Sequence, residues 1–164
     1  MACWAQEPQM LAGAGACRRG FFDAARWARS PLSYQAERCD MAEELVINAP
    51  IEERYVDYNG HKTYVKIVGE RKDNGKKPLL VLHGGPGDCH NYLLDLARIA
   101  DKYDRQVIFY DQIGCGKSMV ENMGEDYYTY DLWINEYYTV CEALGLDDFH
   151  LFGNSWGGML GMLC

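Results

Sequence analysis

One pentapeptide constrains the fold of this 164-residue chain more than any other feature: residues 153–157 read Gly-Asn-Ser-Trp-Gly. It follows an apolar run at 149–153 and precedes a helix-favouring segment, so Ser155 is predicted on a sharp turn from a strand into a helix. Such a turn exposes a serine hydroxyl as a nucleophile and needs small neighbours, which Gly153 and Gly157 supply. The alternative is a serine that only caps the helix and has no catalytic task.

The remaining pattern of apolar residues predicts alternating strands and helices. Alternating segments at 53–58 and 61–68 flank an Asn-Gly pair, which is the strongest short signal for a β-hairpin. Further strands are expected at 78–82, 106–110 and 149–153, and helices at 91–103, at 129–144 and from Trp156 onward. Helices between strands require right-handed crossovers, so the predicted class is α/β: a hairpin followed by parallel strands with helices on both faces.

The helix expected at 129–144 carries many aromatic side chains. It ends before Gly145, which suits the left-handed position that follows a helix. Its aromatic residues are interpreted either as the buried face and rim of the helix or as the lining of a substrate pocket. The predicted buried face consists of Ile134, Tyr137, Tyr138, Cys141 and Leu144.

A second glycine-rich turn follows the strand at 78–82, where residues 83–87 read His-Gly-Gly-Pro-Gly. The carboxyl ends of parallel strands share one edge of the sheet, so this turn is expected to face Ser155. The backbone N–H groups of Gly85 and Trp156 could then converge as an oxyanion hole. The residues expected to support the loop and the serine turn are His83, Gly84, Gly87, Gly153 and Gly157.

A third turn, at 111–118, reads Asp-Gln-Ile-Gly-Cys-Gly-Lys-Ser and follows the strand at 106–110. Its Gly-Lys-Ser end suggests a phosphate-binding loop, but Asp111 stands where that loop needs a glycine, and its carboxylate would repel phosphate.

Taken in order, the three turns resemble those of the proline iminopeptidase (prolyl aminopeptidase) family of α/β-hydrolases. The resemblance covers about residues 51–164 and looks closest to the branch with tricorn-interacting aminopeptidases.

The resemblance implies an α/β-hydrolase fold and a role for each turn. Ser155 would be the nucleophile, the amides of Gly85 and Trp156 would bind the oxyanion, and Asp111 and Gln112 would belong to a structural loop beside the pocket. Members of the family release N-terminal residues, often proline, from short peptides or amino-acid amides through an acyl-enzyme. They need no metal or organic cofactor and are mostly cytoplasmic. Esterases and amidases of the same fold remain alternatives.

The sequence departs from the family after the nucleophile. The family's acid and histidine, and the helical cap that holds the substrate's amino group, come later in the chain, but no acid or histidine follows Ser155 in this sequence. We therefore expect residues 41–164 to form the N-terminal part of a hydrolase domain with 149–153 as an exposed edge strand. By itself the chain is expected to be an inactive fragment, unless a second polypeptide supplies the missing groups.

The upstream histidines are poor substitutes for the missing base, because the chain order in this fold is serine, acid, histidine. His83 is expected to orient the glycine-rich loop. The others are expected to pack against the sheet, for His150, or to lie on the surface, for His61 and His90.

Composition disfavours several other kinds of partner. A net charge of −8 argues against nucleic acid, and no apolar run reaches the roughly 18 residues of a membrane span. The seven cysteines contain no Cys-x-x-Cys pair, so zinc and redox motifs are unsupported, and reduced thiols in a cytoplasmic protein are expected. The sequence does not indicate an oligomeric state.

Residues 1–40 differ from the rest of the chain in being rich in alanine and arginine. We expect this segment to be poorly ordered or spurious. A start codon assigned too far upstream, a transit peptide and a family-specific extension all remain open.

Overall fold

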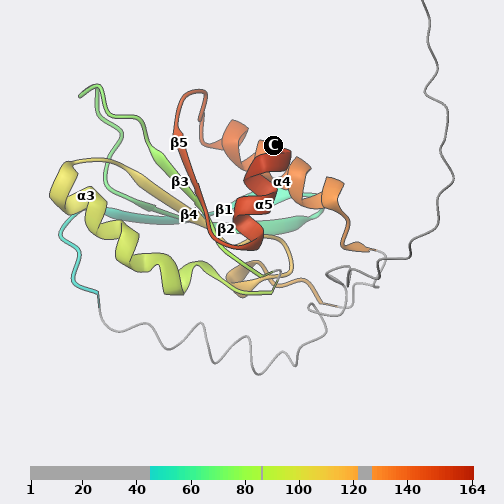
Figure 1. The fold of residues 1–164 in the computed structure, drawn as a ribbon. Coiled ribbons are helices and arrows are strands. Elements are labelled where there is room, and N and C mark those ends of the chain that lie inside the picture. The colour runs from blue at the N-terminus through green and yellow to red at the C-terminus, as the bar shows by residue number, and fades with distance from the viewer. Residues whose placement is uncertain (1–44, 86, 122–126) are drawn as a thin grey trace, which may run out of the picture.

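The computed structural model describes residues 45–85, 87–121 and 127–164, so the expectation for residues 1–40 lies outside the described residues. Within them, five strands form one mixed sheet in the order β1-β2-β4-β3-β5 (Figure 1). The strands are β1 (Ile51–Tyr58), β2 (His61–Val68), β3 (Leu79–Leu82), β4 (Val107–Tyr110) and β5 (His150–Gly153). β2 pairs antiparallel with β1 and β4, whereas β3 pairs parallel with β4 and β5. The predicted α/β architecture is confirmed.

The hairpin of β1 and β2 turns at Asn59 and Gly60, as the Asn-Gly pair predicts. Both residues have left-handed backbones, with φ of 49° and 78°. Two successive positive φ angles make a tight turn whose twist matches that of the strands, so Tyr58 pairs directly with His61.

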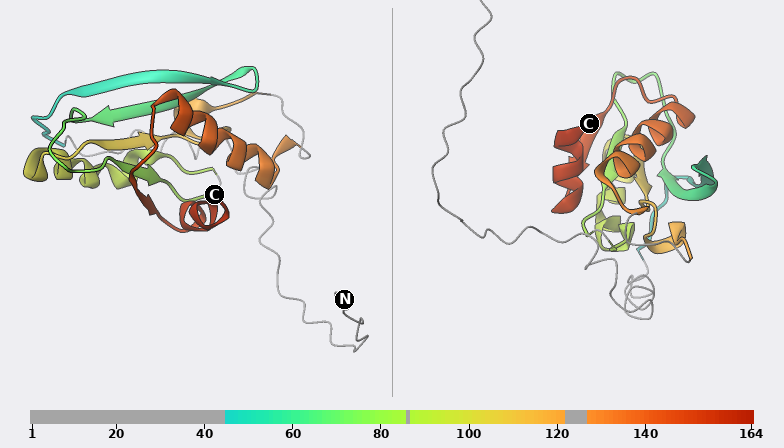
Figure 2. Two further views of the ribbon diagram at one scale, coloured as in Figure 1. Left: turned by 90° about the horizontal axis from the view of Figure 1, so that it is seen from above. Right: turned by 90° about the vertical axis from the view of Figure 1, so that its right-hand side faces the viewer.

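Helices cover both faces of the sheet, as Figure 2 shows from two further directions. They are η1 (His90–Ala97), α3 (Arg98–Tyr103), η2 (Gly116–Ser118), α4 (Tyr130–Ala143) and α5 (Trp156–Leu163). In β3, Leu80 and Leu82 pack into the cluster that contains α4 and α5, while Val81 packs into the cluster that contains η1 and α3. This alternation makes β3 a central strand that is buried on both faces.

The segment expected as a single helix at 91–103 is two elements, since η1 is a 3-10 helix and only α3 is an α-helix. No side chain caps the start of η1. Instead, the amide of His90 donates to the Asp111 carboxylate at 2.9 Å. A contact from a distant loop therefore sets this start, and local periodicity could not predict it.

The predicted face of α4 is partly wrong. Tyr137 and Cys141 are buried, but Tyr138 is 50% exposed, and Glu136 is fully buried. The helix turns the Glu136 carboxylate inward, where it bonds to Thr63 of β2. The left-handed residue after the helix is confirmed, because Gly145 has φ of 61°.

β5 lies at one edge of the sheet, where it pairs only with β3, and all of its residues are exposed. The expectation of an edge strand there is confirmed. None of the helices in the described part of the chain has both the length and the hydropathy needed to cross a membrane.

Candidate active site

Ser155 has a backbone conformation that a helix-capping serine does not adopt. Its φ and ψ are 51° and −117°, although it immediately precedes α5, and its side chain makes no capping hydrogen bond. An ordinary capping serine has an extended backbone and accepts a bond from an amide in the first turn. Ser155 therefore stands at the start of α5 without using its side chain to cap the helix.

Two glycines allow the strained turn to form. A Cβ atom on Gly157 would collide with the carbonyl oxygens of Leu82 and His83, and one on Gly153 would collide with the carbonyl of Gly157. The first turn of α5 therefore packs directly against the end of β3. The need for small residues on both sides of Ser155, inferred from the pentapeptide, has this physical cause.

The turn after β3 lies next to Ser155. Leu82 and Gly153, the last residues of β3 and β5, pair with each other, so both strands end at the same sheet edge. A Cβ atom on Gly84 would lie 3.3 Å from the Cβ of Ser155 and 3.3 Å from Oδ1 of Asn154. The structure thus brings together the two turns that the sequence places far apart.

The amide of Gly84 is already used. It donates to the hydroxyl of Tyr92 at 2.7 Å, and that hydroxyl donates to Oδ1 of Asn154 at 2.9 Å. Across 45–85, 87–121 and 127–164, neither the amide of Gly85 nor that of Trp156 donates to a protein acceptor. These two amides remain the predicted oxyanion donors.

Both ring nitrogens of His83 bond to backbone groups of the two neighbouring loops. Its Nδ1 donates to the carbonyl of Gly84 at 2.7 Å, and its Nε2 accepts from the amide of Gln112 at 2.9 Å; these partners fix the tautomer. The ring is fully buried, and burial lowers the pKa of His83, which keeps the imidazole neutral. Close by, the amide of Gly87 donates to Sγ of Cys115 at 3.2 Å.

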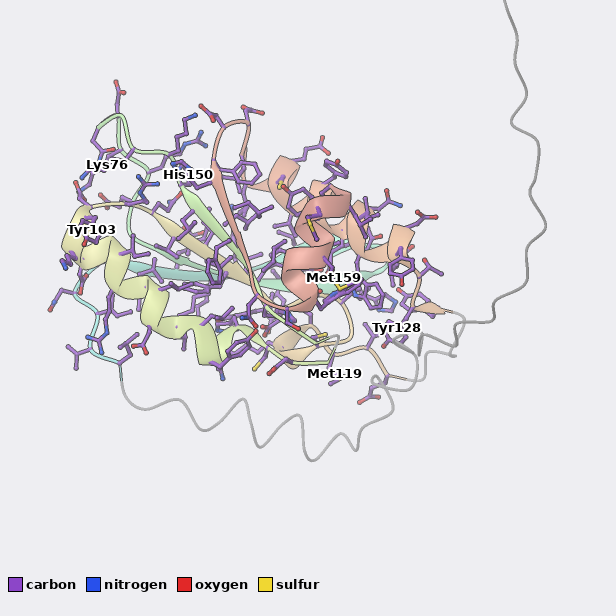
Figure 3. The ribbon with its side chains drawn as sticks, viewed as in Figure 1. Lys76, Tyr103, Met119, Tyr128, His150 and Met159 are labelled. Carbon is purple, nitrogen blue, oxygen red and sulfur yellow. The ribbon has the colours of Figure 1, made fainter. Side chains whose placement is uncertain are left out.

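The expectation that His90 lies on the surface is wrong. Its side chain is buried, and Nδ1 lies 2.8 Å from Oδ1 of Asp111. His150 also differs from the expectation, because it is exposed at the start of β5, whereas Ser155 follows the end of that strand; Figure 3 labels His150. No described histidine therefore contacts the Ser155 hydroxyl.

The loop at 111–118 is held by buried polar contacts. The Asp111 carboxylate accepts from the amides of His90 and Lys117, both at 2.9 Å, as well as from the His90 ring. Burial acts to raise the pKa of Asp111, but the hydrogen bonds and charge of His90 outweigh it and lower that pKa below its ordinary value. Ser118 donates to the Asp111 carbonyl and accepts from the Tyr64 amide, so its hydroxyl is not free for phosphate.

Glu136 is a contributor that the sequence reasoning missed. Its carboxylate accepts from the hydroxyl of Thr63 and, at 2.9 Å, from the amide of Ile113. Burial raises the pKa of Glu136 to about 8, although both hydrogen bonds oppose the shift. The sequence does carry one indication of this burial: Glu136 lies between Trp133 and Val140 on a face of the helix that is otherwise apolar.

The aromatic residues of α4 form part of the support for the serine turn. The rings of Trp133 and Trp156 meet edge-on with centroids 5.0 Å apart, and Tyr130 lies 5.9 Å from Trp156. Among the residues that the structure describes, no group of three histidine, cysteine or acidic side chains could hold a metal ion.

The alpha/beta hydrolase fold family matches residues 77–163 of this chain. The chain is 54% identical over 109 residues to the proline iminopeptidase of Clostridioides difficile (strain 630), covering 66% of this chain and 36% of that protein. It is 49% identical over 114 residues to the proline iminopeptidase of Lactobacillus delbrueckii subsp. lactis, covering 69% of this chain and 38% of that protein.

Among solved structures, the crystal structure of the Mycobacterium smegmatis proline iminopeptidase superposes with a TM-score of 0.63 and 43% identity. That match covers 67% of this chain and 38% of the solved one. The chain therefore spans well under half the length of the relatives that it matches.

Proposed function

Because this chain belongs to the proline iminopeptidase family of alpha/beta hydrolases, we propose that it carries the nucleophile of a serine aminopeptidase. The substrates proposed are short peptides and amino-acid amides, from which the enzyme releases the N-terminal residue, proline among the residues accepted. The 54% identity to a named proline iminopeptidase supports this substrate class. The strained, non-capping turn at Ser155 is the observation that carries the proposal.

In the proposed reaction, Oγ of Ser155 attacks the carbonyl carbon of the first peptide bond while a histidine takes the hydroxyl proton. The carbonyl oxygen becomes an oxyanion and accepts hydrogen bonds from the amides of Gly85 and Trp156. Collapse breaks the C–N bond, and the histidine returns the proton to the departing amine. Water then attacks the Ser155 ester while the histidine takes its proton; the bond to Oγ breaks, Oγ regains that proton from the histidine, and the N-terminal amino acid leaves with a new carboxylate.

The four histidines of this chain do not supply the base of this mechanism. None of them contacts Ser155 in the described structure, and no histidine or acid follows Ser155 in the sequence. We therefore propose that residues 1–164 alone do not hydrolyse peptides, and that the acid, the histidine and the substrate-selecting cap come from further polypeptide. The identity of the nucleophile and the activity of this chain are thus separate questions, with separate tests.

A chimera tests the proposed function. Residues 51–164 would replace the matching segment of the Clostridioides difficile relative, and release of arylamine from a prolyl arylamide would be followed. Hydrolysis by the chimera, abolished by Ser155→Ala, is the expected result. A chimera that melts cooperatively but has no activity above its Ser155→Ala variant would refute the proposal.

The same preparations address the alternative of an esterase or amidase. A chimera that cleaves a p-nitrophenyl ester but not the prolyl arylamide would favour an esterase role for this nucleophile region. The proposed location is the cytoplasm, which suits thiols outside disulfides, as the structure shows for Cys115, Cys141 and Cys164.

A further inference from the structure

The side chain of Gln112 joins the two turns of the candidate site. Its Oε1 accepts from the indole Nε1 of Trp156 at 2.8 Å, and its Nε2 donates to the carbonyl of His83 at 3.0 Å. Its backbone amide donates to Nε2 of the His83 ring at 2.9 Å. One fully buried residue thus contacts both the turn after β3 and the turn before α5.

The chemistry of these partners suits a primary amide. An indole N–H can only donate and a carbonyl can only accept, so a side chain between them must offer one acceptor and one donor. Glutamine offers both from a single planar group, whereas an ionised glutamate cannot donate and a methionine does neither usefully. Because the group is buried, each bond also satisfies an atom that would otherwise be costly to desolvate.

The loop that carries Gln112 is itself anchored on both sides. Asp111 before it accepts from two backbone amides and the His90 ring, and the amide of Ile113 after it donates to Glu136. Asp111 and Glu136 are both buried. The loop is therefore a fixed support, from which the Gln112 side chain can hold the two turns in place.

We propose that Gln112 is a positioning residue that sets the spacing between the backbone amides of Gly85 and Trp156. The catalytic consequence rests on the proposed function, which assigns these amides to the oxyanion. The mechanical part of the proposal, that Gln112 joins the two turns, does not depend on the proposed function. If it is right, removing the Gln112 side-chain amide loosens both turns, although Gln112 belongs to neither turn.

Hydrogen–deuterium exchange on the full chain, read by mass spectrometry, tests the mechanical part. Gln112→Met keeps the length of the side chain and removes both side-chain bonds. We expect exchange to become about tenfold faster in 83–85 and 154–159, with the hairpin at 51–68 unchanged. Faster exchange confined to 111–118, equal acceleration in all segments, or no change would overturn the proposal.

Gln106→Met is the matched control. Gln106 immediately precedes β4, at the end of the strand opposite the candidate site, and its Nε2 donates to the carbonyl of Gly69 at 3.2 Å. The same substitution there removes a glutamine-to-carbonyl bond but should leave exchange in both turns unchanged. If it accelerates them as Gln112→Met does, the effect is not specific to Gln112 and the proposal fails.

A second variant covers the case in which Gln112→Met does not fold. Trp156→Phe removes the indole N–H donor together with part of the ring, and it leaves Gln112 in place. It should accelerate exchange in 83–85 through the broken bond to Gln112. Unchanged exchange in 83–85 would show that the two turns are not joined through this side chain.

The catalytic part is tested in the chimera. Gln112→Met should lower kcat at least about tenfold with little change in KM, because misplaced amides weaken only the bonds that form in the transition state. An active chimera whose kcat is unaffected would overturn the positioning role. An inactive chimera with Gln112 intact would instead refute the proposed function, while the exchange measurement would still decide whether Gln112 joins the turns.

Discussion

At the scale of single residues, Ser155 has an unfavourable backbone conformation, with φ of 51°, because the packing of its neighbours constrains the turn. A non-glycine residue in such a conformation costs on the order of 1–3 kcal/mol. The close packing of α5 on β3, which Gly157 permits, offsets that cost. The glycines beside Ser155 are therefore packing residues as well as turn residues.

The first prediction concerns these glycines. Gly157→Ala should lower the free energy of unfolding by about 2 kcal/mol or more, because its Cβ meets the backbone carbonyls of β3 and His83. Gly158→Ala is the control, since its Cβ would lie 3.3 Å from the Gly153 carbonyl oxygen, a tight contact but clearly longer than the one at Gly157, and alanine favours the helix. Urea unfolding followed by circular dichroism measures both, and equal stabilities for the two variants would contradict the packing argument.

The second prediction follows from the buried carboxyl of Glu136. Its pKa is raised from 4.5 to about 8, so between these values the folded state binds more protons than the unfolded state. The free energy of unfolding should therefore fall as pH rises through this window, by at most about 5 kcal/mol. Glu136→Gln, which cannot ionise, should reduce the slope.

Unfolding by urea at pH 5 and at pH 8 gives the comparison. Contributions from other titrating groups are shared by both proteins, so the difference in slope isolates Glu136. Equal slopes for the wild type and Glu136→Gln would contradict the raised pKa.

Local pattern predicted much of the site but not its supports. Gly-x-Ser-x-Gly and the glycine-rich turn predicted that Ser155 and Gly84 would lie at one edge, where the structure places them. Tyr92 and Glu136 escaped prediction, because they bond to Asn154 and Thr63, which lie far away in sequence. His90 was misplaced for the same reason, since only the folded chain brings it to Asp111.

At the scale of elements, α4 shows how a local signal and a tertiary contact combine. Thr129 caps the helix, with an extended backbone and a hydroxyl that accepts from the amide of Leu132 at 3.2 Å. This start and the end before Gly145 agree with the sequence pattern. The rotation of the helix about its axis differs from the sequence pattern, because the bonds of Glu136 to Thr63 and Ile113 determine which face turns inward.

The third prediction tests the cap. Thr129→Ala should destabilise the protein by about 1 kcal/mol, through loss of a side-chain acceptor at the helix start. Thr139→Ala is the control, because this mid-helix hydroxyl donates to a carbonyl four residues earlier and alanine is the better helix former. Thermal unfolding of both variants measures the difference; a Thr139→Ala variant that is the less stable of the two would contradict it.

At the scale of the whole molecule, the two edges of the sheet differ in how well they are protected. β1 carries Glu52, Glu53 and Arg54 at exposed positions, and charges of this kind discourage edge-to-edge pairing. β5 exposes Leu151 and Phe152, which are 38% and 37% accessible. The apolar edge strand is therefore β5, which ends beside the candidate site, and its free side can pair with another strand.

The fourth prediction is that the chain by itself self-associates through β5. Sedimentation velocity should show concentration-dependent oligomers at micromolar protein, and Phe152→Lys should shift the distribution toward the monomer. Tyr55→Lys, at an exposed position on the opposite edge, should leave the distribution unchanged. A wild-type chain that sediments as a monomer over this range would contradict the prediction.

The central claim is that Ser155 is the nucleophile, set at the tip of β5 beside the turn after β3. Treating the chimera with a fluorophosphonate and locating the adduct by peptide mass spectrometry tests this claim most directly. The account predicts a phosphonyl group on Ser155 and on no other serine of residues 51–164, with none after Ser155→Ala. An adduct on Ser118 instead, or hydrolysis of the prolyl arylamide that persists in Ser155→Ala, would contradict it.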